Sequence, residues 1–211
     1  MAVVSTWLRA APNESDAASG VRAALERGAL AAVQLLGRTD GFLGEPRVRI
    51  PLPENLERVA RLMKATGQGK RVDELVTAMN RAAEAAVPEA RALFVSTVKQ
   101  MSVEDALSVV RGGPTSATDY FSGKTRSTLG ERFLPIVTRA TEKVRLAERY
   151  NQVVAKAAGM GLVKGDAVSL QQHVTARALD GLFFMIGEEE KKIRADPVKT
   201  GSAILRKVFG G

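Results

Sequence analysis

Three polar side chains fall on helix faces that are otherwise apolar. Asn80, Asp180 and Glu189 each have aliphatic or aromatic residues three or four positions away, the spacing of one helix face. A buried polar group without a hydrogen-bond partner costs about 1–3 kcal/mol. Each of the three must therefore belong to an internal hydrogen-bond network or line a pocket that is polar at one end. The sequence leaves both interpretations open.

Tyr120 lies in a second polar stretch, residues 115–125 (TSATDYFSGKT), which gathers hydroxyls, a carboxylate and a lysine around a glycine. A ligand-binding loop has this composition, and helix capping with a tyrosine anchor explains it equally well. Asn80, Tyr120, Asp180 and Glu189 form the candidate ligand-binding set. Methionines 79, 101 and 185 nearby in the sequence would suit an adaptable pocket, although such residues also fill ordinary cores.

The chain lacks the residues that most catalytic chemistry requires. The chain has no cysteine and one histidine, His173, which excludes disulfides, thiolate metal sites and a multi-histidine site within one chain. Residues 67–70 (GQGK) and 159–165 (GMGLVKG) miss the spacing of phosphate and dinucleotide loops. We expect no cofactor and no metal, and no catalytic residue can be assigned. A hydrolase using Asp105, Asp119 or Glu189 is a third option.

The net charge of +8 comes from 31 basic and 23 acidic residues that are spread evenly along the 211 positions. A nucleic-acid surface concentrates Lys and Arg on one face and often adds stacking aromatics, which are only 5% of this chain. A solvated surface of paired charges is favoured over nucleic-acid binding. An anion-binding protein stays among the alternatives.

Helical periodicity dominates the chain, so the sequence predicts an all-α, single-domain bundle of about 7–9 helices. Asp16 is the expected N-cap of the first helix, with residues 1–15 as a flexible segment and 16–211 as the domain. Residues 38–53 (RTDGFLGEPRVRIPLP) read as an extended proline-rich segment whose alternate apolar side chains cover neighbouring helices. Pro135 predicts a kink or break near Phe133 in the longest helix, 125–158.

The longest runs without a charged residue span ten positions, well below the roughly 20 apolar residues that cross a bilayer. We therefore expect no transmembrane segment. The first twenty residues contain no apolar core behind a basic start, so no signal peptide is expected in the chain as written.

Many strings match one family in order and spacing. They include DGFLG (40–44), VRIPLP (48–53), NRAAEAA (80–86), MSVEDA (101–106), TDYF (118–121), FLPIV (133–137), ALDGLF (178–183) and EEKKIR (189–194). With them the chain resembles the bacterial domain-of-unknown-function family numbered 4197 over roughly residues 16 to 210. The resemblance implies a small helical protein that is commonly made with a secretory signal, and hence a periplasmic or envelope-associated location. A cytoplasmic location is the alternative. The resemblance carries no agreed catalytic residues.

The leading hypothesis is a non-enzymatic binding protein that holds an amphipathic or apolar small ligand, or an acidic envelope component, between helices near the candidate set. The alternatives are a structural or protein-interaction module that docks an envelope protein or itself, and a basic nucleic-acid or anion-binding protein. The oligomeric state is left open.

Overall fold

The computed structural model describes residues 12–104, 106–159 and 169–210. Within these ranges lie α1 (Glu14–Leu36), α2 (Glu54–Ala65), α3 (Gly69–Glu89), α4 (Arg91–Gln100), α5 (Ala106–Arg111), α6 (Ser116–Lys143), α7 (Leu146–Gly159), α8 (Leu170–Ala195), the 3-10 helix η1 (Val198–Thr200) and α9 (Ala203–Phe209). No strand occurs in the described ranges. The prediction of an all-α bundle is confirmed.

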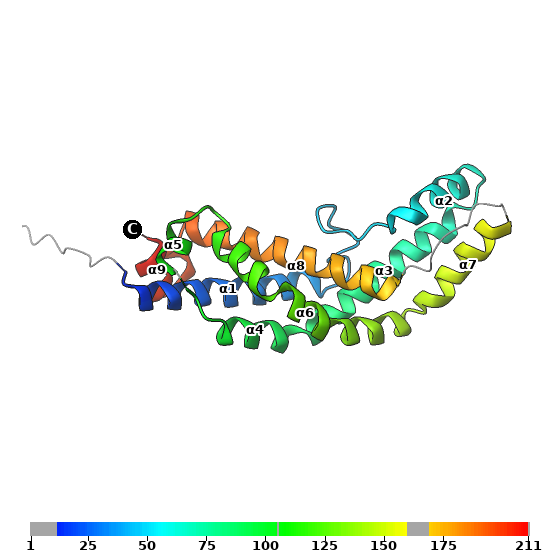
Figure 1. Ribbon diagram of the computed structural model, residues 1–211. Helices are drawn as coiled ribbons and strands as arrows, with labels where there is room; N and C mark the ends of the chain where they lie inside the picture. Colours follow the sequence, from blue (N-terminus) through cyan, green and yellow to red (C-terminus); the bar gives the residue numbers. More distant parts are fainter. Residues whose placement is uncertain (1–11, 105, 160–168, 211) are drawn as a thin grey trace, which may run out of the picture.

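The bundle is elongated (Figure 1). Helices α1, α6 and α8 run along its length and pack on one another, and α4, α5 and α9 pack on α1. Helices α2, α3 and α7 extend to the opposite end, where α3 contacts both α2 and α7. The molecule therefore has one end built around the first turn of α1 and another built around α2.

The core of the bundle is built on the apolar stripe of α8. Val174, Ala178, Leu182 and Ile186 are fully buried at a spacing of four residues, which places them on one helix face. The close approach of α8 to α1 requires a glycine, because a Cβ on Gly28 would lie 3.0 Å from Ile186 Cγ2. This stripe makes α8 the central helix of the long part of the bundle.

The proline-rich segment, residues 38–53, was expected to be extended, and this is wrong for its first part: residues 39–44 and 46–48 form turns, and only 49–53 run without turns. The turns are closed by backbone hydrogen bonds, such as the Gly44 amide to the Asp40 carbonyl at 3.1 Å, and Asp40 itself has a left-handed φ of 63°. No part of the segment pairs in a sheet.

Val48, Ile50 and Leu52 are buried while Arg47 and Arg49 between them are exposed, as the alternation predicts. The segment leaves the end of α1 and runs to the start of α2 across α3 and α8, where Val48 lies close to Gly181. It closes the side of the bundle with aliphatic side chains.

Two helix boundaries correct the sequence expectations. Helix α1 begins two residues before the expected cap, because Asn13 Oδ1 accepts a hydrogen bond from the Asp16 amide at 2.8 Å and is the true N-cap. The predicted flexible segment 1–15 otherwise falls mainly on residues 1–11, which lie outside the described residues. The expected last helix, 198–209, is divided by Gly201, whose φ of 72° gives a left-handed turn between η1 and α9.

Helix α6 continues through Phe133 and Pro135, so of the kink or break expected there, the break is wrong. Pro135 and Glu131, whose carbonyl loses its helical partner, are both exposed, so water can replace the missing bond. The chain breaks later, at Arg145, whose φ of 55° ends α6 and directs the chain into α7. Helix α6 also runs through Gly123 without a break.

We expect Gly123→Ala to stabilise the protein by roughly 0.5–1 kcal/mol, because the exposed helical glycine pays conformational entropy that alanine does not. A Cβ at Gly123 meets nothing within 4 Å. The matched substitution Gly20→Ala should destabilise by about 1–3 kcal/mol, because its Cβ would lie 2.8 Å or less from three side-chain atoms of Val208. Urea unfolding of both variants gives the sign of each change in the free energy of unfolding. Equal changes in the two variants would contradict the packing of α9 on α1.

Candidate functional site

Asn80 is fully buried and serves as a backbone partner. Its Oδ1 accepts a hydrogen bond from the Ile50 amide at 2.9 Å, and its Nδ2 donates to the carbonyls of Ile50 at 2.9 Å and Val76 at 2.8 Å. The amide side chain thus pairs with Ile50 in the way that a neighbouring strand would. Asn80 fixes the proline-rich segment on α3.

Tyr120 is an anchor for the loop between α4 and α5. Its hydroxyl accepts a hydrogen bond from the Glu104 amide at 3.2 Å and donates to the Ser102 carbonyl at 3.3 Å. Lys124 lies over its ring, 5.7 Å from the centroid. The stretch 115–125 is therefore the first turns of α6 rather than a separate loop.

Asp180 is held between two arginines on the surface of α8. It forms ion pairs with Arg126 of α6 and, at 3.3 Å, with Arg177. Its side chain is 41% exposed, so it is not enclosed among apolar side chains as the sequence suggested. Asp180 lies at the border of the α8 stripe, where Arg126 of α6 can reach it.

Glu189 pairs with Arg27 of α1 at 3.6 Å and with Lys192 at 3.3 Å. The expectation that a partner must neutralise this carboxylate is met. No hydrogen bond or ion pair joins any two of Asn80, Tyr120, Asp180 and Glu189, all four of which lie in the described part of the chain. The structure places these residues in four separate sets of contacts.

The more deeply buried carboxylate of α8 is the neighbouring Glu190, which sequence reasoning missed. It accepts hydrogen bonds from the amides of Ala117 and Thr118 at 3.0 and 2.8 Å and from the Thr118 hydroxyl at 2.6 Å. Glu190 thereby caps α6, whose own residue Thr115 makes no side-chain cap, and a carboxylate suits the positive end of the helix dipole. The signal that could have identified Glu190 is its spacing of four residues from Ile186, which belongs to the buried stripe of α8.

Arg194 neutralises Glu190 and extends the same network. Its Nε donates to Glu190 at 2.9 Å, and its two terminal nitrogens donate to the carbonyls of Val110 and Val109 at 2.7 and 3.1 Å. The guanidinium also lies 4.7 Å from the ring centroid of Phe209. One arginine therefore connects α5, α8 and α9 around the start of α6.

Glu84 is the third buried polar residue of this kind, also missed although it lies four residues after Asn80. Its Oε1 accepts hydrogen bonds from the amides of Phe42 and Leu43, both at 3.1 Å. Arg81 pairs with Glu84 at 2.6 Å and with Asp40 at 2.8 Å. The polar groups buried along α3 and α8 thus form structural networks, the first of the two interpretations that the sequence left open.

Two of the hydrolase candidates, Asp119 and Glu189, share no hydrogen-bond or ion-pair partner in the part of the chain that the structure describes. Asp119 accepts a hydrogen bond from the Thr115 hydroxyl at 3.0 Å, as part of the first turn of α6. Asp105 lies outside the described residues. In the described ranges no group of three histidine, aspartate or glutamate side chains could hold a metal ion.

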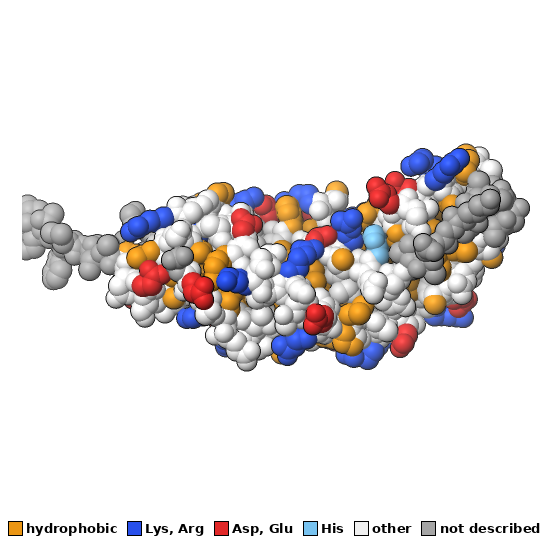
Figure 2. Space-filling view, in the orientation of Figure 1, with side chains coloured by type: hydrophobic (Ala, Val, Ile, Leu, Met, Phe, Trp, Pro, Cys, Tyr) orange, Lys and Arg blue, Asp and Glu red, His pale blue; other side chains and the backbone are white. Residues whose placement is uncertain are grey.

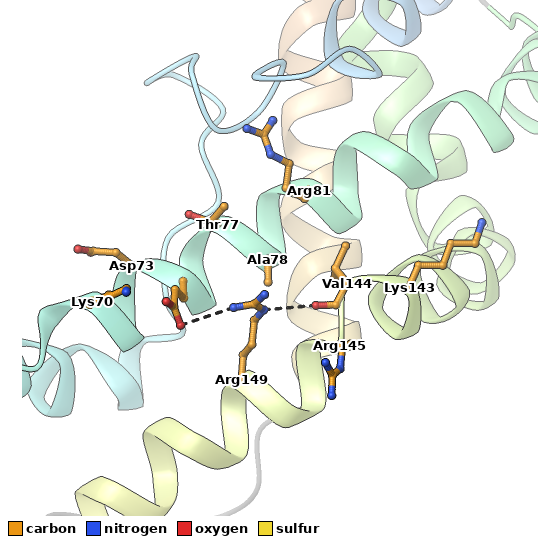
Figure 3. A pocket seen from close by; sticks show the side chains of 10 residues that line it. Lys70, Asp73, Thr77, Ala78, Arg81, Lys143, Val144, Arg145 and Arg149 are labelled. Atoms are coloured by element: carbon orange, nitrogen blue, oxygen red, sulfur yellow. Dashed lines mark hydrogen bonds and ion pairs between the residues drawn. The ribbon is translucent and has the colours of Figure 1, made fainter.

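A hollow of about 790 Å³ lies between α3 and the junction of α6 with α7 (Figure 3). Its arginines are engaged with carboxylates: Arg145 with Glu148 at 2.6 Å, and Arg149 with Glu74 at 3.6 Å. Lys143 pairs with Glu89 at 3.3 Å, and this lysine lowers the pKa of the Glu89 carboxyl below its usual range. Most positive charges of this hollow are thus paired within the protein, and Lys70 is the one lining cation without a carboxylate partner among the described residues.

A second groove, about 650 Å³, lies between α6 and α8 and is lined mainly by small or apolar residues. Its lining consists of Ser122, Gly123, Arg126, Ser127, Gly130, Glu131 and Leu134 from α6 and Gln172, Thr175, Ala176 and Leu179 from α8. Two charged residues, Arg126 and Glu131, also line it, and Arg126 pairs with Asp180. The volume is in the usual range of small-molecule sites, roughly 300–1,000 Å³.

A smaller hollow of about 290 Å³ adjoins the groove on the other side of Asp180. The proline-rich segment contributes Arg47 and Arg49, and α8 contributes Arg177 and Phe184. Arg47 is already paired with Glu45 at 2.9 Å and Glu188 at 3.3 Å, whereas Arg49 has no carboxylate partner among the described residues. The pair of Arg126 and Asp180 therefore lies where the apolar groove meets an arginine-rich hollow.

His173 stands near this hollow and has a structural contact. Its Nε2–H donates to the Pro51 carbonyl at 2.8 Å. Burial lowers the pKa of His173 below 6.5, and the nearby Arg177 lowers it further, while the hydrogen bond to Pro51 opposes the change. The imidazole is therefore neutral at physiological pH and ties α8 to the proline-rich segment.

The described structure is thus an elongated, all-helical domain with buried polar networks and one groove of mainly small and apolar residues between two long helices. No helix of the described part is long and apolar enough to cross a membrane. The chain belongs to the family described as protein of unknown function (DUF4197), whose model matches residues 11–210. No curated protein and no solved structure matches the chain.

Replacing Asn80 should show how much the proline-rich segment depends on it. Asn80→Ala removes three hydrogen bonds and leaves the buried Ile50 amide and carbonyl unpaired, so we expect a loss of about 3 kcal/mol in the free energy of unfolding. The control Thr138→Ala removes a hydroxyl that bonds only the Leu134 carbonyl of its own helix, and should cost under about 0.5 kcal/mol. Similar losses in urea titrations of the two variants would contradict this role.

The lowered pKa of His173 predicts a pH dependence of stability. The folded state resists protonation of this ring more than the unfolded state does, so the histidine contributes stability above pH 6.5 that is lost as pH falls from there toward its folded pKa. Glu188 and Glu89 have pKa values lowered below 4.5 and lose their contributions only at lower pH. His173→Gln should flatten the unfolding free energy just below pH 6.5; an unchanged slope would refute the assignment.

Proposed function

We propose that this protein binds an amphipathic anion, a molecule with an apolar chain and an acidic head, in the groove between α6 and α8. The observation that carries the proposal is the position of the ion pair of Arg126 and Asp180. Arg126 lines the groove and Asp180 lines the arginine-rich hollow beside it. Apolar surface and a source of positive charge are therefore continuous.

The lining of the groove supports an apolar chain as occupant. Gly123, Ser127 and Gly130 have the spacing of one face of α6, and Ala176 faces the groove from α8. Small side chains leave volume between two packed helices that larger ones would fill, which gives a binding groove its depth. Leu134 and Leu179 provide larger apolar contacts.

The charges at the rim support an acidic head. Arg126 and Arg177 share the single carboxylate of Asp180, and Arg49 lines the same hollow without a carboxylate partner in the described ranges. An arginine fork is well suited to pair with a carboxylate or phosphate. Of the four candidate residues from the sequence, only Asp180 takes part, as the group that holds the arginines in place.

Dodecanoate and dodecan-1-ol, which share the chain and differ in the head, test both halves of the proposal by displacement of a fluorescent amphipathic probe. Ser127→Leu fills the groove and should weaken dodecanoate binding about tenfold or more. Thr128→Leu is the matched control, because Thr128 is exposed on the same helix and does not line the groove. It should leave the affinity unchanged.

Variants that change the charge beside the groove separate the contribution of the ligand's acidic head from that of its apolar chain. Arg126→Gln should weaken dodecanoate about fivefold and leave the alcohol nearly unaffected, whereas Asp180→Asn should strengthen dodecanoate by a similar factor because it frees two arginines. Equal effects on acid and alcohol would remove the anionic head from the proposal. Absence of dodecanoate binding, or equal losses in Ser127→Leu and Thr128→Leu, would overturn it.

A further inference from the structure

The strongest local excess of positive charge lies at the end of the molecule formed by α2 and the start of α3. Residues 58–72 contain five basic residues and no acidic one. They are Arg58, Arg61, Lys64, Lys70 and Arg71, and all five are exposed. We name these five residues, together with Leu62 among them, the basic tip.

The two faces of α2 have opposite character. Leu56, Val59, Ala60 and Met63 are buried and α2 packs against α3, while Arg58, Arg61, Leu62 and Ala65 have the spacing of the outer face. Leu62 is 36% exposed, one of three large apolar side chains that reach this exposure in the described ranges. Figure 2 shows basic side chains beside an apolar one over the end of α2.

Little of this charge is neutralised within the protein. Arg61 pairs with Glu57 at 3.7 Å and Lys64 with Asp73 at 3.0 Å, in both cases with side chains about half exposed or more, and such pairs are weak. Arg58, Lys70 and Arg71 have no carboxylate partner among the described residues. The basic tip therefore keeps charge available for a partner.

We propose that the basic tip docks on an anionic lipid surface. Lys and Arg are attracted to such a surface, and an apolar side chain among them can enter the boundary between headgroups and acyl chains. Leu62 has this position between Arg58, Arg61 and Lys64. A single-stranded nucleic acid would call for stacking aromatics, and residues 54–77 contain none. The inference is independent of the groove between α6 and α8.

The test measures partition of the full chain onto vesicles of phosphatidylcholine and phosphatidylglycerol in equal parts, against phosphatidylcholine alone. Each basic residue near an anionic surface contributes roughly fivefold, so the triple variant Arg58→Gln, Lys70→Gln and Arg71→Gln should lose about a hundredfold. Leu62→Ser should lose several-fold at low and at high salt alike, because its contribution is apolar. Binding of the unaltered protein should weaken as salt rises.

A matched control removes the same charge from the other end of the molecule. Arg111, Lys199 and Arg206 are exposed and also lack carboxylate partners in the described ranges, and they lie on α5, η1 and α9, away from α2 (Figure 1). The triple change of these residues to Gln should lower binding no more than a few-fold. Equal losses in both triple variants, equal binding to the two vesicle types, or binding of duplex DNA without binding of vesicles would each overturn the proposal.

Discussion

Backbone amides that have no partner within a helix need other acceptors, and three buried side chains supply them. Asn80 pairs with Ile50, Glu84 accepts from Phe42 and Leu43, and Glu190 accepts from the first amides of α6. An unpaired buried amide would cost free energy comparable to a lost hydrogen bond. The path of the proline-rich segment and the start of α6 both depend on these acceptors, which all come from α3 and α8.

The groove between α6 and α8 is a consequence of that constraint. Glu190 fixes the first turn of α6 on the second half of α8, and the pair of Phe121 and Phe183, with ring centroids 5.7 Å apart, continues the contact. Beyond this point α6 presents Gly123 and Ser127 instead of large side chains. Because the helices are held together elsewhere, the missing side-chain volume stays open as a groove rather than being closed by a closer approach.

The sequence predicted the helices well because each buries a periodic stripe, and it failed where local propensity was overruled by the surroundings. Pro135 was expected to kink or break α6, and the helix continues through it because that side of the helix faces water. Asn80 could be singled out because an amide on an apolar stripe is conspicuous, whereas three adjacent glutamates made Glu189 and Glu190 hard to separate by periodicity. The partner of Asp180, Arg126, lies 54 residues away, a contact that no local pattern encodes.

The distribution of charge shows the same limit. Counted along the sequence, the positive excess is even, because the basic residues of α2 and the start of α3 are followed in the chain by acidic residues of the same helix, α3. In the fold Asp73 pairs with Lys64 of the basic tip, but the later carboxylates of α3 are engaged elsewhere. Glu74 pairs with Arg149, Glu84 with Arg81 and Glu89 with Lys143. These three neutralise α6, α7 and the middle of α3, so the basic tip keeps most of its charge. A patch is therefore defined by which pairs the tertiary structure forms, and a sum over a sequence window hides it.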